Sequence, residues 1–195
     1  MDNNKLLFIN ACIRKDDSRT LRLAQPMIDK LKENYEIAEV NLCDSEMRPI
    51  ISETCSERLN GNISSFDIVR AKKFAEADRI VVAAPFWDMS FPAILKTYFE
   101  HISISGITFN TKEDGTTEGN CKSDKLLYIT TRGLNIPDND YRDQATSYLK
   151  ALGWLWGISK IYTVSAYGLD IIDETSRNGR IVDAIARGLK ICEKF

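Results

Sequence analysis

The sequence predicts a single α/β domain, residues 1–195, built on a doubly wound parallel sheet with helices on both faces. Short apolar segments rich in β-branched residues alternate along the chain with longer segments of helical period. No internal repeat divides the chain, and 195 residues suffice for one well-filled core but would be cramped as two. The expected strands cover residues 5–11, 37–42, 80–84, 125–131 and 160–166.

The central strand and the helix after it carry the clearest pattern. Residues 80–84 form an uninterrupted apolar run, which is typical of a parallel strand buried on both faces. Pro85 ends this strand, and Ser90 is expected to cap a helix that holds Pro92 in its first turn. Apolar residues then recur at helical spacing: Phe91, Ile94, Leu95, Tyr98, Phe99 and Ile102. The loop 86–89 therefore lies at the carboxyl end of a central strand, where open α/β sheets bind ligands.

The other helices are expected to begin at Ser18, at Ser64 or Ser65, at Tyr141 and at Gly179. Two segments lack a clear period. Residues 43–61 are expected to form an irregular surface excursion, and residues 105–124 a small hairpin or flap.

Composition excludes several classes of protein. A net charge of -2 with scattered Lys and Arg argues against a nucleic-acid surface, and no apolar run approaches the roughly 20 residues that span a bilayer. The polar N-terminus gives no sign of a signal peptide. The cysteines are odd in number and lack a C-x-x-C pair, and His101 is the sole histidine, so a zinc site is not expected. A reduced, cytoplasmic compartment is the prediction.

A strand order of 2-1-3-4-5, the flavodoxin-like order, would place three strand exits on one edge of the sheet. The first exit, 12–20, lacks the G-x-G-x-x-G and P-loop motifs. It offers the hydroxyls of Ser18 and Thr20, the guanidinium of Arg19 and the free amides of a helix N-terminus, which suit a phosphate monoester. The alternative, equally open at this stage, is that Ser18 and Thr20 only cap the helix.

The other two exits suit a planar ligand. Phe86 and Trp87 could stack on a ring or be ordinary half-buried aromatics, and Thr131 and Gly133 offer a hydroxyl and close approach of the backbone. No base lies near Cys12 in the sequence, so we interpret that thiol as structural. We interpret His101 as a helix-surface or interface residue.

These motifs run nearly end to end through the chain. They are Cys12 with Ser18-Arg19-Thr20, Ala84-Pro-Phe-Trp-Asp-Met89, Leu95-Lys-x-Tyr-Phe99, Gly106-Ile-Thr-Phe109 and Thr131-Arg-Gly133. In them the chain resembles the FMN-dependent NADH-azoreductases and the related NAD(P)H:quinone reductases, which have the flavodoxin-like fold.

The resemblance implies a set of FMN-binding residues. The phosphate would be held by Ser18, Arg19 and Thr20, with Cys12 where the family often has serine. The isoalloxazine and ribityl groups would meet Pro85, Phe86, Trp87, Asp88 and Met89. The pyrimidine edge would meet Thr131, Arg132, Gly133 and Leu134, and the substrate pocket would include Phe109 and Asn135. The chain departs from the family pattern at Asp88, which replaces an asparagine, at Leu134, which replaces a glycine, and at Asn135.

The function that this resemblance implies is an FMN-dependent oxidoreductase that works as a homodimer. It would pass two electrons from NADH or NADPH to a quinone, azo or similar planar acceptor in a ping-pong mechanism. Flavin supplies the chemistry, so we name no catalytic side chain and no metal. One alternative is a flavodoxin-like electron carrier, which the mild net charge and the flap disfavour. Another is a regulatory module without turnover.

Overall fold

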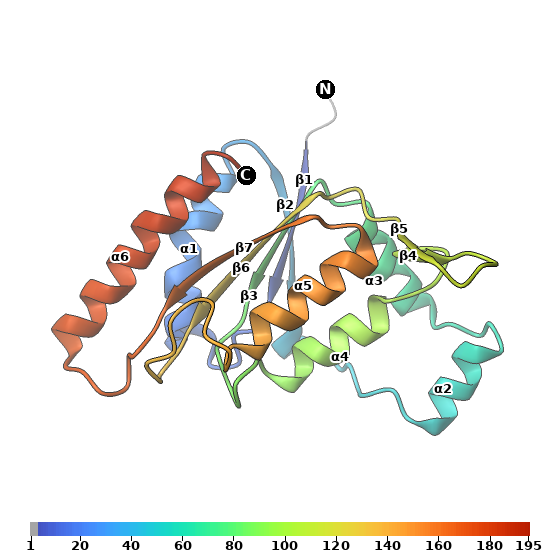
Figure 1. Cartoon of the computed structure of the whole chain (residues 1–195), viewed down its shortest axis with the longest axis horizontal. Helices are drawn as coiled ribbons and strands as arrows, with labels where there is room; N and C mark the ends of the chain where they lie inside the picture. Colours follow the sequence, from blue (N-terminus) through green and yellow to red (C-terminus); the bar gives the residue numbers. More distant parts are fainter. Residues whose placement is uncertain (1–3) are drawn as a thin grey trace.

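The computed structural model describes residues 4–195, so the start of the polar N-terminus, residues 1–3, lies outside the described part. Its main sheet is parallel and five-stranded, in the order β2-β1-β3-β6-β7 (Figure 1). Because β6 and β7 are the fourth and fifth parallel strands of the chain, this confirms the predicted order 2-1-3-4-5. The strands are β1 (Lys5–Asn10), β2 (Glu36–Asn41), β3 (Arg79–Ala83), β6 (Lys125–Thr131) and β7 (Lys160–Ala166).

Helices cover both faces of the sheet, which confirms the doubly wound architecture (Figure 1). One face is covered by α1 (Arg19–Leu31) and α6 (Glu174–Cys192), which pack on each other. The other face is covered by α3 (Ser65–Ala75), α4 (Ala93–Ile102) and α5 (Gln144–Trp156). None of the helices in the described chain combines the length and apolar character needed to cross a membrane.

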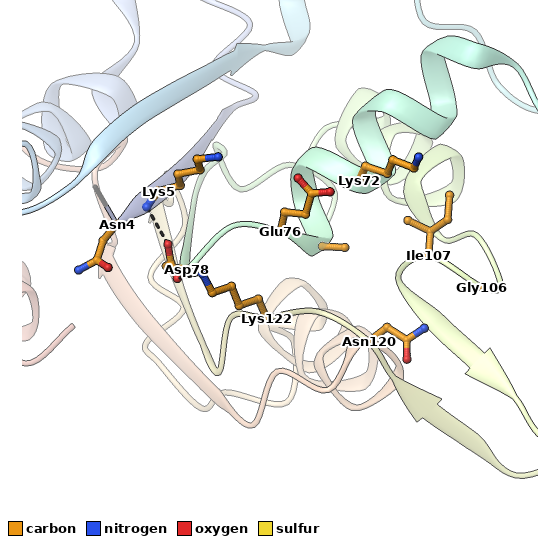
Figure 2. A pocket seen from close by; sticks show the side chains of 10 residues that line it. Asn4, Lys5, Lys72, Glu76, Asp78, Gly106, Ile107, Asn120 and Lys122 are labelled. Atoms are coloured by element: carbon orange, nitrogen blue, oxygen red, sulfur yellow. Dashed lines mark hydrogen bonds and ion pairs between the residues drawn. The ribbon is translucent and has the colours of Figure 1, made fainter. Parts of the chain in front are cut away.

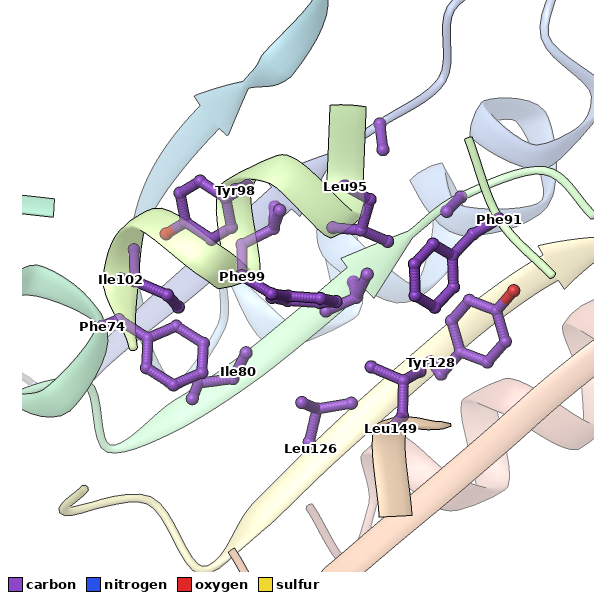
Figure 3. Close-up of a cluster of buried hydrophobic side chains, with 14 of the residues drawn as sticks. Phe74, Ile80, Phe91, Leu95, Tyr98, Phe99, Ile102, Leu126, Tyr128 and Leu149 are labelled. Carbon is purple, nitrogen blue, oxygen red and sulfur yellow. The ribbon is translucent and has the colours of Figure 1, made fainter. Parts of the chain in front are cut away.

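Strand β3 shows why the central apolar run carries no alternation. Ile80 and Val82 face the core under α3, α4 and α5, whereas Val81 and Ala83 face the core under α1 and α6. Both faces are buried, so both must be apolar. On the first side, aromatic side chains fill the space between α4, β3 and β6 (Figure 3).

The predicted flap is a two-stranded antiparallel hairpin, β4 (Phe109–Thr111) with β5 (Thr117–Gly119). It packs on the C-terminal end of α5, where the amide of Cys121 donates to the carbonyl of Trp156 (3.1 Å). A Cβ atom on Gly119 would lie 1.9 Å from the backbone nitrogen of Gly157, so only glycine permits this approach.

The expectation of an irregular excursion over residues 43–61 was wrong in part. Residues Ser52–Leu59 form a helix, α2, none of whose residues is buried. Its start is held by the hydroxyl of Thr54, which accepts from the amide of Ile51 (3.0 Å). A short exposed helix has no apolar stripe, so hydrophobic periodicity could not reveal it. The structure therefore has six α-helices within residues 4–195, where five were expected.

Three helix starts also differ from the prediction. Helix α4 begins one residue after Pro92, and Ser90 pairs with Trp87 instead of capping it. Helix α5 begins later than expected because Asp143 is its cap. Helix α6 begins earlier because Asp173 caps it, which places Gly179 inside the helix. In the last two helices, the aspartate cap and not the hydrophobic pattern sets the first residue of the helix.

Candidate cofactor site

The three predicted loops meet at the carboxyl edge of the sheet, because β1, β3 and β6 are neighbours (Figure 1). Hydrogen bonds join each loop to the next. The amide of Ala11 donates to the carbonyl of Ala83 (2.8 Å), and the amide of Phe86 donates to that of Thr131 (3.1 Å). The buried hydroxyls of Thr20 and Thr131 share a bond of 2.6 Å. The first and third loops are thus directly connected.

The first loop ends at the N-terminus of α1. Ser18 caps this helix, since its hydroxyl accepts from the amide of Leu21 (3.2 Å). The amides of Arg19 and Thr20 belong to the first turn and have no intrahelical acceptor. Together with the positive end of the helix dipole they suit an anion. The guanidinium of Arg19 lies 2.8 Å from the carboxylate of Asp170, in the loop between β7 and α6.

Cys12 opens the first loop as a buried packing group. Its thiol lies 3.7 Å from the carbonyl of Ala83, and its amide donates to the side chain of Asn10 (3.0 Å). Burial raises the pKa of Cys12 to about 11, so the thiol stays neutral near pH 7. The geometry agrees with the interpretation of Cys12 as structural.

The second loop contains a two-residue hairpin turn with unusual backbone angles, residues 87–90, here called the Trp87 turn. The amide of Trp87 donates to the carbonyl of Ser90 (3.0 Å), and the reverse bond measures 2.8 Å. The central residues, Asp88 and Met89, have φ of 48° and 65°, the pattern of a type I′ turn. Two consecutive non-glycine residues with positive φ indicate a conformation imposed by the surroundings.

The two adjacent aromatic residues of this loop differ in exposure. Phe86 is buried, and the guanidinium of Arg132 lies 5.1 Å from the centre of its ring. Trp87 keeps 44% of its surface exposed, and Met89 keeps 39%. Phe86 is therefore a core aromatic, whereas the exposed faces of Trp87 and Met89 can meet a planar ring. Pro85, half-buried, links this loop to β3.

The third loop combines a buried arginine with an open apolar surface. Arg132 is fully buried, and its amide donates to the carbonyl of Ala166 (2.8 Å). At Gly133, a Cβ atom would lie 1.8 Å from a carboxylate oxygen of Asp170, so a larger residue here would displace that side chain and disturb its pairing with Arg19. Leu134 is more than half exposed. Asn135 lines a cavity of about 600 Å³ beside the carboxyl end of β7.

Phe109 lies away from the other predicted site residues of the same chain. Helix α4 starts next to the second loop and leads to the hairpin that contains Phe109. Its ten residues span about 15 Å. Helix α5 runs the same way: the amide of Gln144 donates to the carbonyl of Met89 (3.0 Å), and the last turn contacts the hairpin. Both helices thus separate Phe109 from the carboxyl edge (Figure 1).

Two acidic residues of this edge escaped the sequence analysis. Asp143 binds Arg132, and a cap pattern, aspartate three residues before Thr146, could have revealed its place at the start of a helix. Asp170 pairs with Arg19 from a loop 151 residues away, and no local pattern predicts such a contact.

A second cavity, of about 610 Å³, lies at the opposite edge of the sheet (Figure 2). Its lining includes Lys5 at the start of β1, and Asp78 and Lys122 just before β3 and β6. It is therefore remote from the three loops, and it shares no residue with them.

The residues at the carboxyl edge fit FMN. The helix N-terminus with Arg19 suits a phosphate, and the exposed side chains of Trp87, Met89 and Leu134 suit a flat aromatic ring system. Gly133 leaves the backbone of the third loop without a side chain beside that surface.

The fold and this site define a flavodoxin-like protein. A family model for the flavodoxin-like fold matches residues 4–190. An FMN-dependent NADH:quinone oxidoreductase of Clostridium beijerinckii is 34% identical over 179 residues, covering 88% of this chain and 89% of that protein. The enzyme of the same name from Coprothermobacter proteolyticus is 30% identical over 201 residues, covering 98% and 99%. The chain therefore belongs to this flavodoxin-like family.

Solved structures show the same fold. An azoreductase from Bacillus anthracis str. Sterne superposes with a TM-score of 0.82 at 20% identity, covering 98% of this chain and all of that one (100%). An FMN-dependent NADH-azoreductase from Bacillus anthracis str. Ames Ancestor, solved in complex with FMN, gives a TM-score of 0.80 at 24% identity, covering 97% and 99%.

Proposed function

We propose that this protein is an FMN-dependent oxidoreductase that passes two electrons from NADH or NADPH to a quinone, azo or similar planar acceptor. The observation that carries the proposal is the joining of three loops at one sheet edge, with a helix N-terminus beside the exposed surfaces of Trp87 and Met89. The names of the relatives, FMN-dependent NADH:quinone oxidoreductases, support the choice of cofactor and reaction.

Each loop has a distinct part in this proposal. The α1 N-terminus, with Ser18, Arg19 and Thr20, holds the FMN phosphate. Trp87 and Met89 lie against the ring system, and the loop from Thr131 to Leu134 borders its pyrimidine edge. Bound FMN supplies the two-electron chemistry, and the protein binds it, orients it and excludes water. Donor and acceptor use the same face in turn, which requires ping-pong kinetics.

The position of Phe109 supports a homodimer. If this aromatic contributes to the substrate pocket, it must do so in a second copy, because α4 and α5 separate it from the site of its own chain. The hairpin of one copy would then complete the pocket of the other. We also propose a cytoplasmic location, which the widely spaced cysteines, all free within residues 4–195, support.

The visible spectrum of the purified protein tests the function. We expect the protein to retain FMN through gel filtration and to be bleached anaerobically by NADH or NADPH, then recoloured by a quinone. Bleaching only by a reduced protein partner would identify an electron carrier. A protein that stays colourless after incubation with FMN would be a module without turnover, and the proposal would fail.

A further inference from the structure

Asp143 is a buried carboxylate, and both of its oxygens accept hydrogen bonds. It is 2% exposed and caps α5. One oxygen accepts from the amide of Thr146 (3.0 Å). The other accepts from the hydroxyl of Thr146 and from the guanidinium of Arg132, both at 2.7 Å. The carboxylate therefore joins a helix N-terminus to the third loop of the site.

The guanidinium of Arg132 shapes that loop around itself. It donates to the carbonyls of Ile136 and Pro137, each at 3.0 Å, and to the carboxylate of Asp138 at 3.2 Å. Its flat side covers the ring of Phe86 in the second loop. An arginine held by Asp143 thus fixes the residues that follow Gly133 and also the base of the Trp87 turn.

The cap places the first amide of α5 as well. This amide, of Gln144, donates to the carbonyl of Met89 (3.0 Å). Met89 is one of the two central residues of the turn, both of which have positive φ, and such a conformation persists only where neighbouring groups restrain it. Asp143 consequently acts on the second loop through Gln144 and on the third loop through Arg132.

We propose that Asp143 is a positioning residue of the flavin site. Through Arg132 and the α5 N-terminus it holds loops 85–89 and 131–135 in the conformation that receives FMN, before the cofactor binds. The inference rests on the proposed function, because it assumes that FMN binds between these loops. Preorganised loops lose less conformational freedom on binding, so affinity depends on what holds them.

The chain contains a matched control for the cap. Asp173 caps α6 with the same geometry, accepting from the amide of Ser176 at 3.0 Å and from its hydroxyl at 2.7 Å. It is exposed, and among the described residues it pairs with no guanidinium. Asp143→Asn and Asp173→Asn therefore make the same change at a helix cap, but only the first removes an ion pair beside the site.

FMN titration of the apo-proteins, followed by the quenching of flavin fluorescence, tests the inference. We expect Asp143→Asn to weaken FMN binding at least about tenfold and to alter the visible absorption bands of the bound flavin at saturation. Asp173→Asn should stay within about twofold of wild type, with an unchanged spectrum. Near-UV circular dichroism would confirm that each protein is folded at the temperature used.

A second pair of variants covers the case in which Asp143→Asn does not fold. Gln144→Pro removes the amide that donates to the carbonyls of Met89 and Arg142, and an exposed side-chain bond to Tyr141; proline itself is well tolerated at the first helical position. Glu174→Pro is its control in α6. We expect a severalfold loss of FMN affinity in the first and none in the second.

The outcomes separate the two proposals. Wild-type protein that binds FMN, beside two aspartate variants of equal affinity, would overturn the role of Asp143 and leave the proposed function standing. Wild-type protein that binds no FMN would overturn both.

Discussion

The two edges of the sheet each carry a carboxylate that joins neighbouring segments, yet the settings differ. At the amino edge, Asp78 accepts from the amide of Lys5 (2.8 Å) and pairs with Lys122 (2.6 Å), whose side chain is 63% exposed (Figure 2). At the carboxyl edge, Asp143 pairs with Arg132, and both side chains are inaccessible or nearly so. Burial is the main difference between the two pairs.

Position, rather than ion-pair chemistry, decides what the loss of either pair does to stability and to the site. The Asp78 side chain is 18% exposed, but water reaches its partner Lys122, so loss of the pair leaves neither charge without solvation and should change the free energy of unfolding little. In the dry interior, loss of one partner from the Asp143 pair leaves a charge with no water to solvate it. The buried pair also lies where the strand exits form the candidate site. We therefore expect its removal to affect both stability and FMN binding.

The largest expected effect is the loss of stability caused by Arg132→Met. This change leaves the Asp143 carboxylate buried and unpaired, which should lower the free energy of unfolding by about 3–5 kcal/mol. Its counterpart at the amino edge, Lys122→Met, should lower that free energy by less than about 1 kcal/mol. Urea unfolding of the two apo-proteins gives both numbers. Equal losses would show that burial does not distinguish the edges.

A double variant sharpens this result. Arg132→Met combined with Asp143→Asn removes both charges from the interior, and the asparagine side-chain oxygen can still cap α5. It should regain most of the stability that Arg132→Met loses, although not the affinity for FMN. A double variant as unstable as the single one would mean that the pair stabilises the fold directly.

The next effect concerns the hydroxyl bridge between Thr20 and Thr131. If Thr20 also binds the FMN phosphate, Thr20→Val should weaken FMN binding by about 1–3 kcal/mol, whereas riboflavin, which lacks the phosphate, should bind both proteins alike. Thr131→Val is the matched control because it removes the other end of the same 2.6 Å bond. Thr131 also borders the proposed pyrimidine edge, which riboflavin shares with FMN. Similar losses of affinity for FMN and for riboflavin in both variants would therefore assign the effect to the loops that the bridge holds and not to a phosphate contact of Thr20.

A smaller effect is expected at Asp88. Its carboxylate is exposed, and within residues 4–195 it has no ion-pair partner, so water screens its charge. Asp88→Asn keeps a residue that tolerates positive φ and removes a negative charge that disfavours reduced, anionic flavin. An interaction of about 1 kcal/mol or less corresponds to an increase of about 20 mV or less in the two-electron midpoint potential. Spectroelectrochemical titration measures it, and a lower potential would contradict the argument.

The sequence was sufficient for the sheet and for the place of the site. Buried parallel strands such as β3 must be apolar on both faces, so they stand out as continuous runs, and alternation with helices orders them. Once the order was predicted, the loops after β1, β3 and β6 had to meet at one edge, and the structure confirms that they do.

The contacts that hold the site could not be predicted in the same way. The Trp87 turn has none of the Asn-Gly or Asp-Gly pairs that announce a type I′ turn, because its conformation is imposed from outside. The bond between Arg132 and Asp143 depends on the path of the irregular loop that connects β6 to the cap of α5. Side-chain partners across loops follow from tertiary structure, and hydrophobic period carries no information about them.

The smallest expected effect is the pH dependence of the amino-edge pair. The ammonium of Lys122 and the amide of Lys5 hold the pKa of the Asp78 carboxyl below its usual value of 3.8. A lowered carboxyl pKa stabilises the folded state fully above the usual value, and that contribution is lost as the pH falls through the lowered one. The free energy of unfolding of wild type should therefore exceed that of Asp78→Asn by less than about 1 kcal/mol at pH 7.

Thermal unfolding of both proteins across the acid range checks the sign of this effect. The difference should be constant at neutral and mildly acidic pH and should shrink below about pH 4, where the carboxyl becomes protonated in the unfolded chain. Lys122→Met is the control, since it removes the ammonium and keeps the carboxylate. The difference in stability between wild type and Lys122→Met should follow the same pH profile. Asparagine and protonated aspartate can both accept the Lys5 hydrogen bond, so a difference that persists unchanged at low pH would show that the carboxylate charge is not its source.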